Sequence, residues 1–507
     1  MRWTRWAVAA AASVVAVTAA GCTSGVGTAS GTGPGGNGPG GNGTHLIAGR
    51  VTPAAGPVPV AAPLTGGTGI DLVSAGSVPA LPTGWVEAEY SVAGTATSYR
   101  AVGPLPADGR FHLAPSGTAS YKTRIVVRRP PASKFNGTVV VEWLNVSGGL
   151  DAAPDYTYLA PELIRAGYAW VGVSAQYIGV EGGPVAVQTP VSNLGGAGKG
   201  LVHVDPARYG SLHHPGDAFS YDIFTQVGRL LRNPGAVAPL GTLHPHVLLA
   251  AGESQSAIML TTYVDGVQPL EHMYDGFLIH SRSGSAAPLG SPGTGIDITQ
   301  GIGGPPTRIR TDLHAPVIMV ETESDVVGLL NYLPASQPDT SRIRTWEVAG
   351  TAHVDLAQLG AVATLFGCST PVNAGPDAFI VRSALAHLDT WARGGAAPPH
   401  APRFDIAGGK YVRNSDGIIE GGIRTPLVDV PVDVLSGQPG PGGSVACLLA
   451  GSTTPLPASR LAQLYPSRSA YLAAYTKSTD AAIAAGFVLP ADRAAMLALA
   501  QPDRIAG

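Results

Sequence analysis

The stretch HVLLAAGESQSAIMLTTYV, residues 246–264, joins two apolar runs through a short polar turn. The first run has the length of a buried strand, and the second begins a pattern that favours a helix. In the turn GESQSA, residues 252–257, Ser254 has Gly252 two positions before it and Ser256 two positions after it. A serine between small residues at such a joint is either an ordinary helix cap or the centre of a strained turn that exposes its hydroxyl. The segments on either side have to decide between these interpretations.

Strands and helices alternate on both sides of this joint. Buried strands are predicted near residues 137–146, 169–174, 274–280, 315–321 and 342–348. Helices are predicted from about residue 155, over 217–232 and over 377–395. Two segments with alternating polarity, 85–94 and 121–129, predict antiparallel strands that open the sheet. The whole pattern predicts an α/β fold with a mostly parallel central sheet flanked by helices, whose ligand site lies at the carboxyl ends of the strands.

The composition excludes one class of partner. The chain has 507 residues, which is long enough for a large catalytic domain with insertions. Charged residues make up 13% of it, and the formal net charge is −3. We expect no nucleic-acid partner, because no basic face could hold a phosphate backbone. The 68 glycines and 44 prolines predict many loops and insertions on a globular frame.

Two later strands supply the partners that a reactive serine needs. The strand APVIMVE is followed by TESDVVG, where Asp325 occupies the position of an acid, with Glu321 and Glu323 as alternatives. The strand RIRTWEV is followed by AGTAHVD, which places His353 in the next loop. Serine, acid and histidine in this order, each after a strand, are typical of nucleophilic catalysis by a triad. We therefore predict that Ser254, Asp325 and His353 are the catalytic residues.

Backbone N–H groups near Ser254 could stabilise an oxyanion. Gln255 follows the serine, and the loop NVSGG, residues 145–149, follows the first central strand. We predict one donor at Gln255 and a second at Val146 or Ser147, although the loop could also be a plain glycine turn. The histidine pairs at 213–214 and 244–246 lack the further ligands of a tetrahedral site. We predict no metal and no cofactor.

The N-terminus predicts an exported protein. Arg2 and Arg5 precede the apolar stretch AVAAAASVVAVTAA, which is too short to span a bilayer comfortably and ends at Gly21 and Cys22. This arrangement resembles a bacterial lipoprotein signal, in which the cysteine is lipidated and becomes the first mature residue, although Ala19 stands where leucine is usual. We expect a signal peptide over 1–21, lipidation of Cys22 and a Gly-rich flexible tether over 22–45. The protein would then be attached to the outer face of the cell membrane through its lipid, or alternatively secreted.

The cysteine count fits export. Apart from Cys22 the chain contains Cys368 and Cys447. In an oxidising compartment these two can form one disulfide, and two unpaired buried thiols are the alternative.

The chain resembles the α/β-hydrolase superfamily and, more narrowly, a group of largely uncharacterised bacterial α/β-hydrolase-domain proteins. The segments VEWLNVSGG, GESQSA, DGFLIHSR, ETESDV, AGTAHVD and EGGIRTPLVDVP carry this resemblance. It covers nearly everything after the tether and implies a serine hydrolase scaffold over 46–507. We expect insertions at about 177–216 and 283–312 and an irregular extension from about residue 396. The first insertion and part of the extension would form a lid over the site.

The expected activity is hydrolysis of a small-molecule or lipid carboxylic ester through an acyl-enzyme intermediate. Two alternatives stay open at this point. One is a peptidase or amidase with the same triad, and the other is a non-catalytic surface binding lipoprotein on a hydrolase scaffold.

Overall fold

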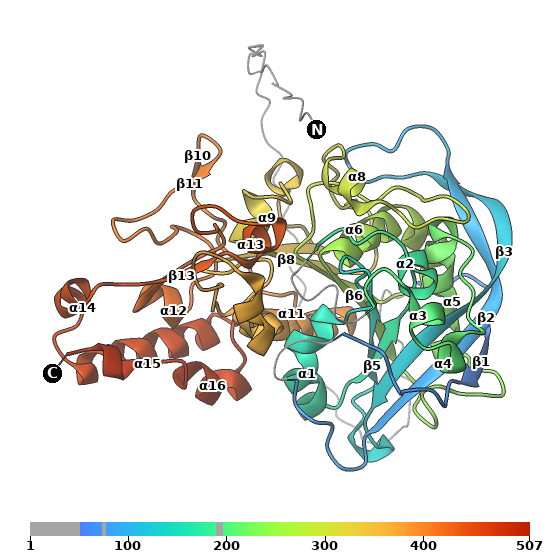
Figure 1. The fold of residues 1–507 in the computed structure, drawn as a ribbon, viewed down its shortest axis with the longest axis horizontal. Coiled ribbons are helices and arrows are strands. Elements are labelled where there is room, and N and C mark those ends of the chain that lie inside the picture. The colour runs from blue at the N-terminus through green and yellow to red at the C-terminus, as the bar shows by residue number, and fades with distance from the viewer. Residues whose placement is uncertain (1–50, 74–77, 189–195, 507) are drawn as a thin grey trace, which may run out of the picture. The chain divides into compact units, whose positions relative to one another are not determined.

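The computed structural model describes residues 51–73, 78–188 and 196–506. A mixed sheet of nine strands forms the centre of this part of the chain (Figure 1). Its strand order is β1-β2-β3-β5-β4-β6-β7-β8-β9. The strands span Val60–Pro63 (β1), Val86–Ala101 (β2), Leu113–Arg129 (β3), Thr138–Trp143 (β4), Ala169–Val173 (β5), Val247–Glu253 (β6), Gly276–His280 (β7), Val317–Thr322 (β8) and Ile343–Val348 (β9). Pairing is antiparallel from β1 to β3 and between β3 and β5, and parallel from β5 through β9. The predicted fold class is confirmed.

The central strands are apolar because helices cover both faces of the sheet. Successive residues of a strand point to opposite faces. In β4, Val139 and Val141 pack into one hydrophobic core, and Val140 packs into the other. The first core receives α5 (Ser220–Arg232) and α6 (Gln255–Thr262), and the second receives α1 (Pro154–Ala166) and α11 (Asp377–Ala392).

Short helices lie in the segments between these layers. They span Tyr177–Glu181 (α2), Leu201–Val204 (α3), Pro206–Tyr209 (α4), Gln268–Glu271 (α7), Ile298–Ile302 (α8), Glu323–Val326 (α9) and Leu356–Leu359 (α10). The segment 177–216 contains α2, α3 and α4, and the segment 283–312 contains α8. A 3₁₀ helix, Gly360–Phe366, continues directly from α10.

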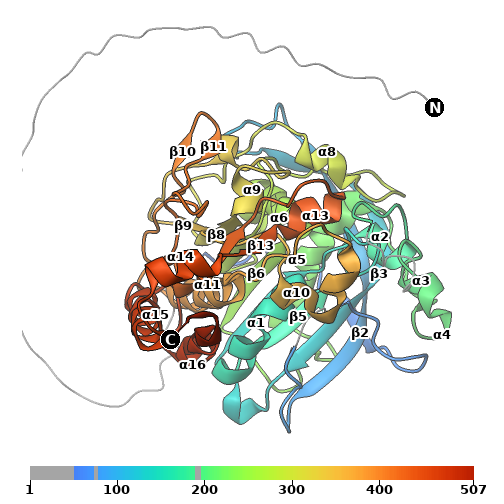
Figure 2. The same cartoon turned by 60° about the vertical axis from the view of Figure 1, so that its left-hand side comes forward.

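The part of the chain that follows α11, called the C-terminal segment below, carries small strands and helices beside the main sheet (Figure 2). They span Ile406–Ala407 (β10), Lys410–Tyr411 (β11), Pro426–Asp429 (α12), Asp433–Ser436 (β12), Val445–Ala450 (α13), Ser452–Pro455 (β13), Ala458–Leu464 (α14), Arg468–Ala484 (α15) and Arg493–Leu497 (α16). Phe487 and Met496 are buried in the same core as Trp346 of β9 and Leu385 of α11. The segment therefore shares a hydrophobic core with the sheet.

The structure contains the predicted disulfide between Cys368 and Cys447, with the Cα atoms 5.6 Å apart. The expected signal peptide, the tether and Cys22 lie outside the described residues. None of the helices in the described ranges is long and apolar enough to cross a membrane.

Candidate active site

Ser254 lies in a strained turn between β6 and α6. Its φ of 61° and ψ of −121° are rare for a residue other than glycine. Its N–H donates to the carbonyl of His280 at 2.9 Å, which ties the turn to the end of β7. At Gly252 an added Cβ would lie 2.9 Å from Leu260 Cδ1 and 3.1 Å from the backbone of Ser256, so a side chain there would clash. Of the two interpretations of GESQSA, this geometry is that of the strained turn.

Ser256 occupies the second small position of the turn. Its side chain is buried, and its Oγ donates to the carbonyl of Glu253 at 2.8 Å. The fold tolerates a buried hydroxyl at this position because the hydroxyl can donate a hydrogen bond to a nearby carbonyl oxygen.

The structure brings the three predicted catalytic side chains together. His353 Nε2 lies 2.8 Å from Ser254 Oγ, and His353 Nδ1 lies 2.7 Å from Asp325 Oδ1. The other oxygen of Asp325 accepts hydrogen bonds from the N–H and the hydroxyl of Thr322, both at 2.7 Å. Both carboxylate oxygens of Asp325 are thus occupied, and its orientation toward His353 is fixed.

The electrostatics around Asp325 favour its ionised form. Burial alone would raise the pKa of Asp325, but the attraction of His353 and the hydrogen bonds from His353 and Thr322 outweigh burial and lower this pKa below its ordinary value. The two alternative acids lie in other surroundings. Glu323 accepts from Arg413 and from the N–H of Gly350. The carboxyl of Glu321 is fully buried, and burial raises its pKa well above the ordinary value.

The backbone N–H groups predicted for an oxyanion hole differ in their bonding. Gln255 is the first residue of α6, where an N–H has no acceptor within the helix. The N–H of Ser147 donates to Asn145 Oδ1 at 2.8 Å, and the N–H of Val146 donates to the side chain of Gln255 at 3.3 Å. Both candidates for the second donor therefore have partners in this structure, and the second donor stays a prediction.

A cavity of about 470 Å³ opens above Ser254 and His353. One side is formed by the loop after β4, including Asn145 and Gly148. Val187 and Ala197 from the 177–216 insertion, together with Ala446 and Leu449 from α13, line other parts of it. These four residues come from the two segments that were expected to form a lid.

A third wall of the cavity was missed by the sequence analysis. Val354, Gln358, Leu359, Val362 and Phe366 line it, and they belong to the segment that follows His353. The short α10 and the 3₁₀ helix after it have too few turns to produce a recognisable hydrophobic period.

Two polar side chains that sequence reasoning did not single out connect these walls to the turn. Asn145 donates through Nδ2 to the carbonyl of Glu253 at 3.0 Å, and Gln358 donates through Nε2 to both carboxyl oxygens of Glu253 at 2.9 Å. Asn145 opens the loop NVSGG, and Gln358 lies five residues after His353. The only feature of the sequence that could have indicated a role for Asn145 or Gln358 is its closeness to a predicted site residue.

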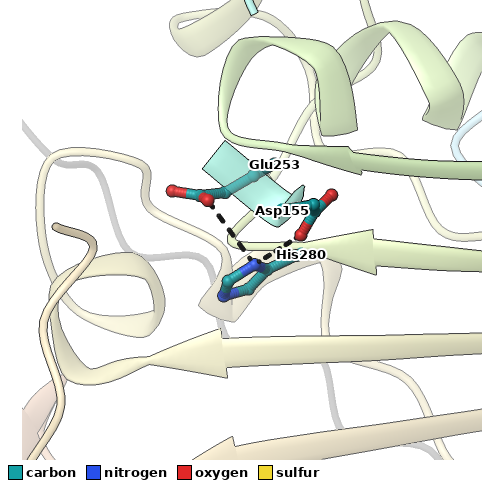
Figure 3. Close-up of side chains that lie close together, drawn as sticks. All are labelled: Asp155, Glu253 and His280. Carbon is teal, nitrogen blue, oxygen red and sulfur yellow. Dashed lines mark hydrogen bonds and ion pairs between the residues drawn. The ribbon is translucent and has the colours of Figure 1, made fainter. Parts of the chain in front are cut away.

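A buried cluster of charged groups lies behind the turn. Asp155, Glu253 and His280 offer possible metal-ligating atoms within 4.8 Å of one another (Figure 3). His280, however, uses both ring nitrogens, Nδ1 toward Asp155 and Nε2 toward Asp377, each at 3.0 Å. Because both ring nitrogens lie against carboxyl groups and the pKa of His280 is raised, we expect a doubly protonated imidazole, which has no lone pair for a metal. The cluster therefore fits a buried imidazolium better than a metal centre.

The pKa values in this cluster agree with that interpretation. Burial would lower the pKa of His280, but the carboxyls of Asp377 and Asp155 raise it well above its ordinary value. Burial raises the pKa of Glu253 to about 8, against the attraction of His280. At neutral pH we therefore expect a charged His280 beside a largely protonated Glu253.

The mostly parallel sheet, the strained serine turn and the cavity above it together define an α/β hydrolase. Residues 56–498 match a protein family described as an alpha/beta hydrolase domain, and the chain belongs to this family. Because it belongs to this family, the protein is a hydrolase.

Solved structures with some similarity include esterases. A chain from a study of two fungal esterases of Rhizomucor miehei has 13% identity and a TM-score of 0.31, and the match covers 60% of this chain and 85% of that chain. A putative dienelactone hydrolase from Klebsiella pneumoniae has 14% identity and a TM-score of 0.26, with 51% and 85% covered. A putative carboxylesterase from Lactobacillus plantarum has 12% identity and a TM-score of 0.24, with 48% and 82% covered. No protein of curated function has a significantly matching sequence.

Proposed function

We propose that this protein hydrolyses carboxylic esters, with Ser254 as nucleophile, His353 as general base and Asp325 as the acid that orients the base. The observation that supports the proposal most directly is the pair of short contacts at His353, 2.8 Å to Ser254 Oγ and 2.7 Å to Asp325 Oδ1. These distances are within the range that proton transfer between nucleophile and base requires.

In the first step His353 Nε2 takes the proton of Ser254 as Oγ attacks the ester carbonyl. Asp325 keeps the proton of His353 on Nδ1 and stabilises the imidazolium that forms. The N–H of Gln255 and a second donor from the loop after β4 would stabilise the developing oxyanion. His353 then protonates the leaving alcohol, a water attacks the acyl-enzyme with His353 as base, and the acid is released with Ser254 restored.

A serine-directed fluorophosphonate probe tests this assignment on the full-length chain. We expect the wild type to be labelled and Ser254→Ala to lose the label, because the probe reacts with an activated serine. Ser116→Ala is the matched control, since Ser116 is an exposed serine in β3, and it should label like the wild type. Hydrolysis of an aryl acetate should fall on the order of 10⁴-fold in Ser254→Ala.

Other outcomes of this test would point to the alternatives. Labelling that is equal in Ser254→Ala and the wild type would reject the nucleophile, and absence of labelling in both would favour a binding protein on a hydrolase scaffold. Faster turnover of a matched anilide than of the ester would favour an amidase.

We also propose that the protein is exported and attached to the membrane through a lipid on Cys22. The support is the charged start, the short apolar stretch and the small residues before this cysteine. Metabolic labelling with an alkyne fatty acid should tag the wild-type chain in the membrane fraction and leave Cys22→Ala untagged. A wild-type chain that is untagged and found in the medium would indicate secretion instead.

A further inference from the structure

The cavity above Ser254, called the apolar pocket below, is poor in charge. Among the described residues that line it, the ionisable side chains are Glu253 and His353, and none is a lysine or an arginine. Both carboxyl oxygens of Glu253 already accept from Gln358, so this group is engaged by the protein itself. A substrate carboxylate or phosphate would find no cationic side chain among these described residues to offset its desolvation. The chemistry of the lining thus favours an uncharged ligand.

Three buried apolar residues from two segments line part of the apolar pocket. Leu359 and Phe366 come from the segment after His353, and Leu449 comes from α13. Their side chains are 8%, 9% and 6% exposed, respectively. Leu359 and Phe366 pack in one hydrophobic cluster with Ala446 of α13. We call Leu359, Phe366 and Leu449 the outer wall.

A disulfide joins the two segments of this wall, and polar contacts connect the wall to the rest of the fold. The disulfide joins Cys368, two residues after Phe366, to Cys447, two residues before Leu449. On the inner side, Gln358 bonds to Glu253, and Asp355 accepts from the hydroxyl of Tyr158 at 2.8 Å. A wall that is attached at both ends limits the size of what the pocket accepts.

We infer that the apolar pocket binds a hydrocarbon chain of an uncharged ester and that the outer wall sets the longest chain that fits. This inference rests on the proposed function, because it takes the reacting ester to lie at Ser254. Each methylene that enters the pocket should raise affinity about fourfold, until the chain reaches the outer wall.

Turnover of ester series by the full-length chain tests the inference. One series varies the acyl chain from acetate to decanoate with a p-nitrophenyl leaving group, and the other varies the alcohol with a fixed acetyl group. In at least one series kcat/KM should rise about fourfold per carbon and then level off. An ester that carries a terminal carboxylate on the same chain should react at least tenfold more slowly than its neutral counterpart.

Leu449→Trp and Leu448→Trp form a matched pair on α13. Leu449 lines the pocket, whereas its neighbour Leu448 is 40% exposed. Leu449→Trp should lower the ratio of kcat/KM for the longest esters to kcat/KM for the acetate at least tenfold, because the larger ring shortens the pocket. Leu448→Trp should keep the wild-type profile. Rates that do not depend on chain length in either series, or equal effects of the two tryptophans, would overturn the inference.

Binding in the Ser254→Ala background separates this inference from the proposed function. Titration calorimetry with neutral alkyl esters measures the pocket without turnover, and Leu449→Trp should weaken binding of the long esters in that background as well. Should the wild type fail to hydrolyse esters while this binding pattern is present, the proposed function fails and the pocket assignment stands. Should Ser254-dependent turnover occur while affinity is independent of chain length, the pocket assignment fails and the proposed function stands.

Discussion

Glu253 carries a buried carboxyl one residue before the proposed nucleophile, and its titration should be visible in the stability of the protein. Burial raises its pKa from the ordinary 4.5 to about 8. Across this window the folded state binds the proton more tightly than the unfolded state does, so this group's contribution to stability falls as pH rises. Glu253→Gln keeps an acceptor for Gln358 but cannot ionise.

As pH rises from 5 to 8, the free energy of unfolding of the wild type should therefore fall relative to that of Glu253→Gln. The limiting slope is about 1.4 kcal/mol per pH unit. Thermal unfolding of both proteins from pH 5 to pH 9 measures it. Glu253→Ala is the control and should be less stable than the glutamine variant throughout, because it leaves a small cavity and the Gln358 amide unpaired. A pH-independent difference between glutamine variant and wild type would contradict the raised pKa.

Single residues of the candidate site could be predicted where their position along the chain specifies their surroundings. Ser254, Asp325 and His353 each follow a strand with a clear apolar pattern, and the carboxyl ends of parallel strands meet at one edge. Asn145 and Gln358 could not be assigned in this way. Their bonds to Glu253 span 108 and 105 positions, and no local pattern in the sequence records such pairs.

At the scale of elements, length decided what the sequence could predict. The buried strands appear as continuous apolar runs, and the amphipathic α5 has enough turns to show a helical period, so these elements were located within a few positions. α10 has four residues and the 3₁₀ helix after it has seven, so the wall that they form was not recognised. The disulfide then joins this segment to α13, closing a loop of 79 positions. In the chain-entropy description a loop of this length stabilises the fold by roughly 4.5 kcal/mol.

At the scale of the whole molecule, the C-terminal segment is part of the core that supports the triad. Phe487 packs edge-on against Trp346, with ring centroids 5.2 Å apart. Trp346 is fully buried in β9, the strand that leads to His353. The sequence predicts an irregular Gly/Pro-rich extension here that ends in two short Ala-rich helices over about 467–500, and its glycines and prolines hide the few residues that reach the sheet.

Phe487→Ala should lower the free energy of unfolding by about 3 kcal/mol, because it opens a cavity against Trp346 in the core beside the sheet. Leu472→Ala is the matched control in α15, where Leu472 is 41% exposed, and it should change stability by no more than about 0.5 kcal/mol. Far-UV circular dichroism and labelling of Ser254 by the fluorophosphonate probe should be lost together on heating, and both should be lost at a lower temperature in Phe487→Ala. If the C-terminal segment folded as an independent domain, helix content would fall in two steps on heating. Phe487→Ala would then shift only one of these steps, and the loss of labelling at Ser254 would coincide with the other step. A shared transition is expected because residues from both regions fill one hydrophobic core.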